Sequence, residues 1–210
     1  MNIFFIDRDY TTCAKMHNDK HVVKMILEYA QLLSTAHRVL DGTITEGKSP
    51  SGRKRTTYVL NDNRESRLYV ATHVNHPSAI WVRQSYANYV WLSHLLTQLC
   101  AEYTYRYGKK HKVESSGLEE ELMYPPMNIP NAPFTEPPPA MPEQYRVTGN
   151  SIQSYHNYYL NDKRKMSRWT NREMPSWFAE GINTLYNDAV YMFFNSKLDR
   201  IVSMPMSQYK

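Results

Sequence analysis

The sequence predicts a mainly α-helical protein that forms a single compact domain over residues 1–210. Long stretches place apolar residues three and four positions apart, which is the spacing of an amphipathic helix. No internal repeat and no alternating strand pattern competes with this periodicity. With 41% hydrophobic and 13% aromatic residues among 210, the chain has enough apolar surface for a buried core.

The chain opens with an apolar, β-prone segment, residues 1–6, which we expect to be extended and packed beside the first long helix. A turn at 7–10 leads into a helix. The most regular helix starts at Asp19, which can cap it, and stops at Gly42. Its apolar positions follow the helical spacing: Val22, Ile26, Tyr29, Leu33, Ala36 and Leu40.

The remainder alternates loops and helices. Residues 43–67 are polar and glycine-containing, and we expect a basic loop there. A second long helix is predicted from Pro77 to a stop at Gly108. Residues 113–149 hold eight of the twelve prolines, which predicts an extended segment that wraps the surface. Two further helices are expected over 151–170 and 179–197.

The net charge of +5 is concentrated in three windows, 48–55, 106–112 and 163–172, which hold 13 of the 25 Lys and Arg residues and no acid. Clusters of this kind form positive faces for phosphate, although three solvated runs pointing in different directions are the alternative. Between residues 155 and 177, around the third window, Tyr and Trp side chains are interspersed with the cations, and such rings can stack on exposed bases. The residues predicted to contact nucleic acid are Lys20, Arg53, Lys54, Arg55, Arg106, Lys109, Lys110, Lys112, Tyr158, Lys163, Arg164, Lys165 and Arg168.

One narrow face of the helix that follows Asp19 carries polar side chains suited to acid–base chemistry. They are His17, His21, Lys24, Glu28, Gln31 and Thr35. Lys24 is three residues from His21 and four from Glu28, so the amine and the carboxylate can influence each other's protonation. The alternatives are an ordinary solvated face with helix-supporting ion pairs, and a metal site that uses His17 and His21 at their spacing of four.

The run Asp19, Lys20, His21, followed seven positions after the histidine by Glu28, resembles the bacteriophage pyrimidine-dimer DNA glycosylases of the phage endonuclease V type. In that small all-α family, a D-x-H motif precedes the catalytic glutamate at the same spacing. The sequence SYHNYY at 154–159 is also similar to a late segment of that family. Longer motifs resemble a group of uncharacterised phage-encoded proteins: HPSAIW at 76–81, EYTYRYGKKHK at 102–112 and MPEQYR at 141–146.

The resemblance implies a mechanism in which an N-terminal α-amine attacks the sugar C1′, forms an imine and permits β-elimination of the strand. Carried over, Glu28 stabilises the developing charge and assists proton transfer, and His21 contacts DNA near the lesion. The family's nucleophile is a small second residue, whereas Asn2 is bulky here. The amine is therefore that of Met1, or the role passes to Lys24 or Lys20.

We therefore predict a DNA-binding enzyme that acts on a nucleobase or its glycosidic bond, with Glu28, Met1, Lys24 and His21 as catalytic residues. Its expected partner is damaged or modified double-stranded DNA. No cofactor, metal or membrane is expected. The alternatives are a non-catalytic phage nucleic-acid-binding protein and a metal-dependent hydrolase using His17 and His21.

Localisation is predicted from what the sequence lacks. It shows no long apolar stretch and no signal-peptide pattern, which predicts a soluble protein in the cytoplasm of a bacterial or phage-infected cell. Cys13 and Cys100 have no CxxC partner and are expected to be reduced core thiols.

Overall fold

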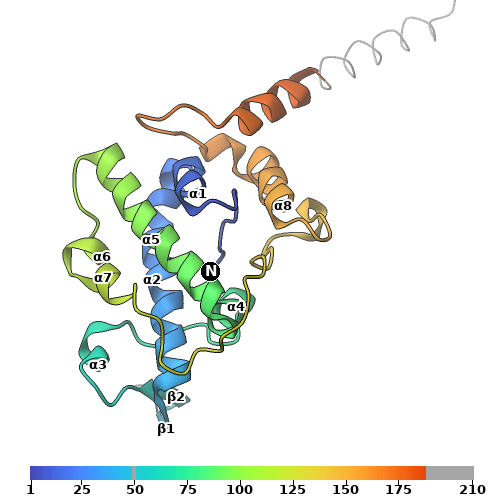
Figure 1. Ribbon diagram of the computed structural model, residues 1–210. Helices are drawn as coiled ribbons and strands as arrows, with labels where there is room; N and C mark the ends of the chain where they lie inside the picture. The colour runs from blue at the N-terminus through green and yellow to red at the C-terminus, as the bar shows by residue number, and fades with distance from the viewer. Residues whose placement is uncertain (49–50, 188–210) are drawn as a thin grey trace, which may run out of the picture. The chain divides into compact units, whose positions relative to one another are not determined.

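A computed structural model describes residues 1–48 and 51–187, and it is mainly helical, as the sequence predicts (Figure 1). The chain divides into two compact units, Met1–Glu173 and Met174–Lys210. The first unit holds all the elements discussed below except the helix over 176–187. The prediction of one domain over the whole chain stays a prediction. Among the described residues, no helix combines the length and the apolar character that a membrane crossing requires.

The core of the first unit is a pair of long helices, α2 and α5, which pack against each other (Figure 1). The shorter α1 packs on α5, and α4 packs on both α2 and α5. The bounds of these helices are α1 Tyr10–Met16, α2 Asp19–Asp41, α4 Pro77–Gln84 and α5 Tyr86–Tyr107. Leucines and other apolar residues at helical spacing on the facing sides are fully buried, so the predicted periodicity places the core correctly.

The extended N-terminal segment is confirmed. Ile3 and Phe5 are fully buried, and the amide of Phe4 donates a hydrogen bond to the hydroxyl of Tyr29 on α2 at 3.0 Å. Burial of these apolar side chains holds the segment against the helix pair. Cys13 and Cys100 are both buried free thiols.

The start of α2 differs from the prediction in one detail. Asn18, not Asp19, is the N-cap, and its side-chain oxygen accepts from the amide of His21 at 2.9 Å. Asp19 is instead the first helical residue, and its carboxylate accepts from Arg106 and from the backbone and hydroxyl of Thr170. Asn and Asp both cap helices well. Here the Asp19 carboxylate is engaged by Arg106 and Thr170, so Asn18 is the residue that caps α2.

The prediction of one continuous helix from Pro77 to Gly108 is wrong, because Ser85 divides this range into α4 and α5. Ser85 has an extended backbone, φ −149° and ψ 134°, and its hydroxyl caps α5 while donating to the carbonyls of Ala132 and Pro133 in the proline-rich segment. The end at Gly108 is confirmed, with a left-handed φ of 66° that favours glycine.

The predicted loop at 43–67 is also wrong. It contains an antiparallel hairpin, with β1 (Thr43–Lys48) paired to β2 (Lys54–Val59), followed by the short α3 (Arg64–Arg67). Threonines and other β-branched residues in both strands favour this conformation. The buried guanidinium of Arg38 on α2 holds the returning chain through the carbonyls of Tyr58, Leu68 and Tyr69.

The proline-rich segment wraps the first unit as predicted, after two short helices at its start. These are α6 (Lys112–Ser115) and α7 (Leu118–Glu121), and a 3₁₀ turn, η1 (Glu143–Tyr145), lies near its end. Between them the chain is extended (Figure 1). In this stretch, the hydroxyl of Thr135 accepts from the Trp81 indole and from the Asn88 amide.

The third predicted helix is shorter and less regular than expected. It consists of α8 (Ser151–Tyr158), a π-helical turn η2 (Tyr159–Lys163) and a 3₁₀ turn η3 (Arg164–Met166), and does not reach 170. The fourth is observed over 176–187 in the second unit, and the remainder of its predicted range lies outside the described residues.

Candidate functional site

All four predicted catalytic residues line one cavity of about 160 Å³, which we call the N-terminal cavity. Three elements form it: the N-terminal segment, the first half of α2, and the junction of α8 with η2. Its lining residues are Met1, Asn2, Phe4, His21, Lys24, Met25, Glu28, Tyr158 and Lys163. Residues 1, 28 and 163 meet here only because the N-terminal segment and η2 both pack against α2.

The amine and carboxylate groups of the cavity are close together. Lys24 Nζ lies 3.1 Å from Glu28 Oε1, with Lys24 69% exposed and Glu28 only 15% exposed. Met1 is held by its carbonyl, which accepts from the Ser78 hydroxyl at 3.2 Å. The pKa of His76 is lowered by burial and then by the charge of the Met1 amine, while Glu28 acts in the opposite direction. Both charges therefore lie near enough to His76 to influence its pKa.

His21 is a neutral, fixed part of the cavity wall. Its Nδ1 lies 2.6 Å from the Tyr159 hydroxyl, and its ring stacks on Phe4 with centroids 4.0 Å apart. Burial, followed by the positive charges nearby, holds its pKa far below the ordinary value. His21 therefore cannot neutralise a phosphate, and its contact with a ligand falls to Nε2 as a hydrogen bond.

Lys163 and Tyr158 line the part of the cavity formed by the junction of α8 with η2. The Lys163 amine lies 4.7 Å from the centre of the Tyr158 ring and 2.7 Å from Asp162. The ring of Tyr158 is nearly parallel to that of Phe4, with centroids 6.5 Å apart. Both residues are predicted to bind nucleic acid, and the structure places them beside the predicted catalytic set. Helical periodicity does not anticipate this pairing, because Lys163 lies in a π turn.

Asn2, Phe4 and Met25 belong to the cavity but were not predicted. Phe4 and Met25 carry no signal in the sequence beyond that of core residues. Asn2 is held by its side-chain amide, which donates to the carbonyl of Ala140 at 2.6 Å. Because that partner is 138 residues away, the contact is visible only in the folded chain.

His17 lies outside the cavity, in the core. Its Nδ1 donates to the carbonyl of Cys13 at 2.7 Å, and its Nε2 accepts from the Tyr29 hydroxyl at 3.2 Å. Burial lowers its pKa to about 4, so the ring is neutral. Both nitrogens are engaged within the protein, which leaves none for a metal ion. In the described part of the chain, no three His, Cys, Asp or Glu side chains are arranged to hold one.

Arg106 corrects the prediction for the second basic window, because its side chain is buried. The guanidinium donates to Glu102 at 2.7 Å, to Asp19 at 2.9 Å and to the carbonyl of Lys15 at 2.9 Å. All three donor nitrogens are thus used internally, and Arg106 is not available to a phosphate. Glu102 lies just outside the window, and Asp19 is far away in sequence, so an acid-free window does not imply a free cation.

Two of the three basic windows meet at the start of α2. The amide of Asp19, the first residue of α2, donates a hydrogen bond to the carbonyl of Arg168, and its carboxylate accepts from the amide of Thr170. The side-chain amide of Asn171 donates to the carbonyl of Arg106. We call the exposed cations of this region the basic surface: Lys20, Lys109, Lys110, Lys112, Arg164, Lys165 and Arg168. Lys163 joins it to the N-terminal cavity.

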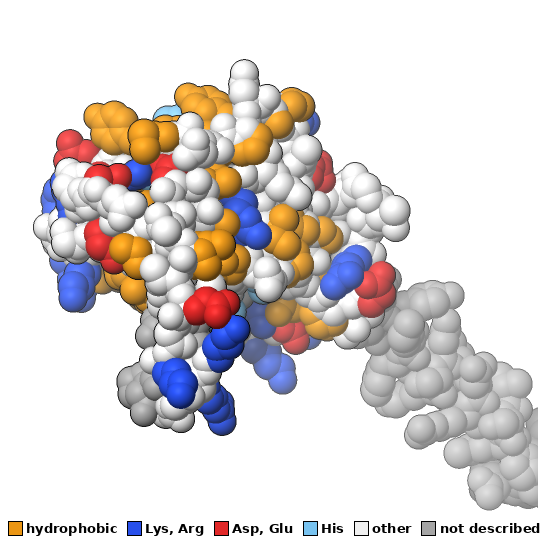
Figure 2. Space-filling view, turned by 90° about the horizontal axis from the view of Figure 1, so that it is seen from below, with side chains coloured by type: hydrophobic (Ala, Val, Ile, Leu, Met, Phe, Trp, Pro, Cys, Tyr) orange, Lys and Arg blue, Asp and Glu red, His pale blue; other side chains and the backbone are white. Residues whose placement is uncertain are grey.

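The window at 48–55 lies at the other end of α2. The hairpin follows the last turn of this 23-residue helix, which is about 35 Å long. Arg53 and Lys54 are exposed there, and Lys54 pairs with Glu46 at 2.9 Å. Figure 2, a view from below, shows several Lys and Arg side chains on the surface of the molecule. The side chain of Arg55 lies outside the described ones. The hairpin is therefore a separate basic region.

Comparisons of this chain with family models, with curated proteins and with solved structures find no match. The resemblance to the pyrimidine-dimer glycosylases stays a prediction from the motif.

Proposed function

We propose that this protein is a DNA-binding enzyme that acts on a damaged or modified nucleobase at its glycosidic bond, with an associated lyase step. The observation that carries the proposal is the N-terminal cavity. It brings the amines of Met1 and Lys24, the half-buried carboxylate of Glu28 and the flat ring of Tyr158 to one place. Amine nucleophile, proton acceptor and stacking surface are the parts that such a reaction uses.

In the proposed reaction, the amine nitrogen forms a bond to the sugar C1′ as the bond from C1′ to the base breaks. The base leaves with that electron pair and takes up a proton, and the sugar ring opens to give an imine. Loss of a proton from C2′ then expels the 3′ phosphate by β-elimination. Glu28 is placed to accept the proton of the attacking amine, since its carboxylate is already in ion-pair contact with Lys24.

The basic surface supports the DNA part of the proposal. Its cations border the cavity through Lys163, so a duplex held by its phosphates there has a nucleotide within reach of the cavity. Tyr158 offers its ring to a base turned out of the stack. Hydrogen bonding from the neutral His21 would then orient the sugar or base edge.

The direct test is reductive trapping. We expect sodium borohydride to link the protein covalently to duplex DNA that carries an abasic site or a pyrimidine dimer, because borohydride reduces the imine to a stable amine. Peptide mapping of the adduct identifies the nitrogen. Of the three predicted nucleophiles, Met1 and Lys24 line the cavity and Lys20 does not. A Lys24→Met variant and a protein with its N-terminal amine acetylated separate the two that do.

Lys109→Met is the matched control, because it removes an exposed amine of the basic surface and leaves the cavity intact. Trapping should be lost in one of the two cavity variants and retained in this control. If neither DNA substrate is trapped while both bind, the enzymatic proposal is wrong, and the non-catalytic nucleic-acid-binding alternative replaces it.

A further inference from the structure

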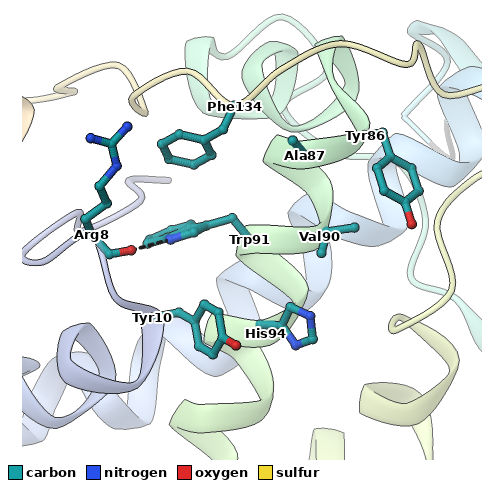
Figure 3. A pocket seen from close by; sticks show the side chains of 8 residues that line it. All are labelled: Arg8, Tyr10, Tyr86, Ala87, Val90, Trp91, His94 and Phe134. Atoms are coloured by element: carbon teal, nitrogen blue, oxygen red, sulfur yellow. Dashed lines mark hydrogen bonds between the residues drawn. The ribbon is translucent and has the colours of Figure 1, made fainter.

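A second cavity, of about 420 Å³, lies among α5, the start of α1 and the proline-rich segment. We call it the aromatic pocket. Five of its residues come from one face of α5 at helical spacing, and the others come from the chain before α1, from α1 itself and from residue 134 (Figure 3). The lining residues are Arg8, Tyr10, Tyr86, Ala87, Val90, Trp91, His94 and Phe134.

The rings of the aromatic pocket are held in place by contacts behind them. The Trp91 indole donates to the carbonyl of Arg8 at 2.8 Å, and the buried Phe5 packs edge-on against Trp91 with centroids 5.1 Å apart. On the other side, Tyr10 stacks on His94 at 5.0 Å. The flat walls are therefore preformed, and a ligand does not need to order them.

One end of the pocket carries a single cation. The guanidinium of Arg8 lies 5.8 Å from the centre of the Phe134 ring, and Figure 3 shows the two side by side, at the end away from Tyr86. Arg8 is exposed, and no ion pair to it is found among the described residues. The neighbouring carboxylates accept from backbone amides, Asp9 from that of Thr12 and Asp7 from that of Asp9, and not from Arg8. In the described part of the chain, the guanidinium of Arg8 therefore stays available to a ligand beside an apolar pocket.

We propose that the aromatic pocket is a binding site for a small planar aromatic carboxylate. The ring of the ligand would lie against Trp91 and Val90, and its carboxylate would take two parallel hydrogen bonds from the Arg8 guanidinium. Most of the wall is ring and alkyl surface, which favours such a ligand over a nucleobase. The polar edges of a base would lose water there with few partners to replace it. This site is independent of the N-terminal cavity and of the function proposed for it.

The test uses 2-naphthoate as the probe and its neutral analogue 2-naphthalenemethanol as the comparison, with the full chain and isothermal titration calorimetry. We expect 2-naphthoate to bind at least tenfold more tightly than the alcohol. The Nε1–H resonance of Trp91 in a ¹⁵N NMR spectrum should shift during the titration, which locates the ligand. Arg8→Gln should weaken 2-naphthoate binding about tenfold and leave the alcohol unchanged.

Two variants serve as controls. Arg164→Gln removes an exposed arginine of the basic surface and should leave 2-naphthoate binding unchanged. Tyr86→Ala truncates a wall residue that is 48% exposed, so the fold should tolerate it, and both probes should bind more weakly. Equal binding of acid and alcohol, absence of binding by both, or tighter binding of adenosine monophosphate than of 2-naphthoate would each overturn the proposal.

Discussion

The two cavities lie on opposite sides of the same short segment and have opposite chemistry. Successive side chains of extended chain point to opposite faces, so Phe4 lines the N-terminal cavity while Phe5 packs behind the aromatic pocket. The first cavity contains three amines, those of Met1, Lys24 and Lys163, and one carboxylate, whereas the second is built from rings with one cation at its end. Six residues of extended chain are therefore enough to separate a polar, reactive environment from an apolar one.

The supports of the two cavities differ in the same way. Behind the N-terminal cavity, hydrogen bonds run from the Phe4 amide to Tyr29 and on to His17, and a separate bond joins His21 to Tyr159. Behind the aromatic pocket, ring contacts predominate. A buried polar network has a specific geometry but depends on protonation, whereas ring packing does not. We therefore expect changes of pH to affect mainly the N-terminal cavity. The walls of the aromatic pocket should respond mainly to changes in side-chain size.

The largest expected effect is on catalysis. Glu28→Gln should lower the single-turnover rate of base excision by about 10²- to 10⁴-fold, the usual contribution of a general acid or base. The change is almost isosteric on a half-buried helix face, so thermal unfolding should be little changed. Tyr86→Ala, on the aromatic side, should keep wild-type activity. A Glu28→Gln protein that no longer folds would show that Glu28 is structural.

The next largest effect is on DNA affinity and its dependence on salt. Replacing Lys163, Arg164, Lys165 and Arg168 together by Gln should lower the slope of log affinity against log salt by about 3.6, at about 0.9 per phosphate contact. Neutralising Arg53 and Lys54, at the far end of α2, should leave this slope nearly unchanged. Filter binding to duplex DNA over a range of salt concentrations measures both. An unchanged slope in the fourfold variant would show that these cations of the basic surface do not contact DNA phosphates.

Acid should destabilise the protein through its buried histidines. The pKa of His17 is lowered by burial to about 4, against an ordinary value near 6.5, so the unfolded chain takes up its proton first. Stability is then full above pH 6.5 and is lost as pH falls toward 4, by about 1.4 kcal/mol per pH unit for each such histidine. Urea unfolding at pH 7, 6 and 5 measures this loss. His17→Gln should show a shallower dependence, and equal stability at pH 7 and 5 would contradict the buried neutral ring.

The smallest effect is on base recognition. Tyr158→Ala should weaken binding to DNA with an unstacked or damaged base by about 1 to 3 kcal/mol, the range for one stacked base. Binding to intact duplex should change much less, because phosphate contacts dominate there. Fluorescence anisotropy with matched intact and abasic duplexes provides the comparison. An equal loss for both would place Tyr158 in general packing.

The sequence alone determined the helical class, the extent of α2, the helix stop at Gly108 and the wrapping course of the proline-rich segment. Each depends on local chemistry: apolar periodicity, a glycine that accepts a positive φ, and prolines that cannot continue a helix. It also singled out Glu28, Lys24 and His21, because spacings of three and four residues place them on one face of a helix.

Which of these groups meet, and which remain free, depends on how the folded elements pack. Ser85 divides a helix because the proline-rich segment binds its hydroxyl, and Arg106 is buried because Asp19, 87 residues away, supplies a counter-charge. The N-terminal cavity needs Met1 and Lys163 together, and the aromatic pocket needs Arg8 beside Phe134. Contacts of such long separation leave no periodic trace in a sequence, because they depend on how whole elements pack and not on the preferences of neighbouring residues.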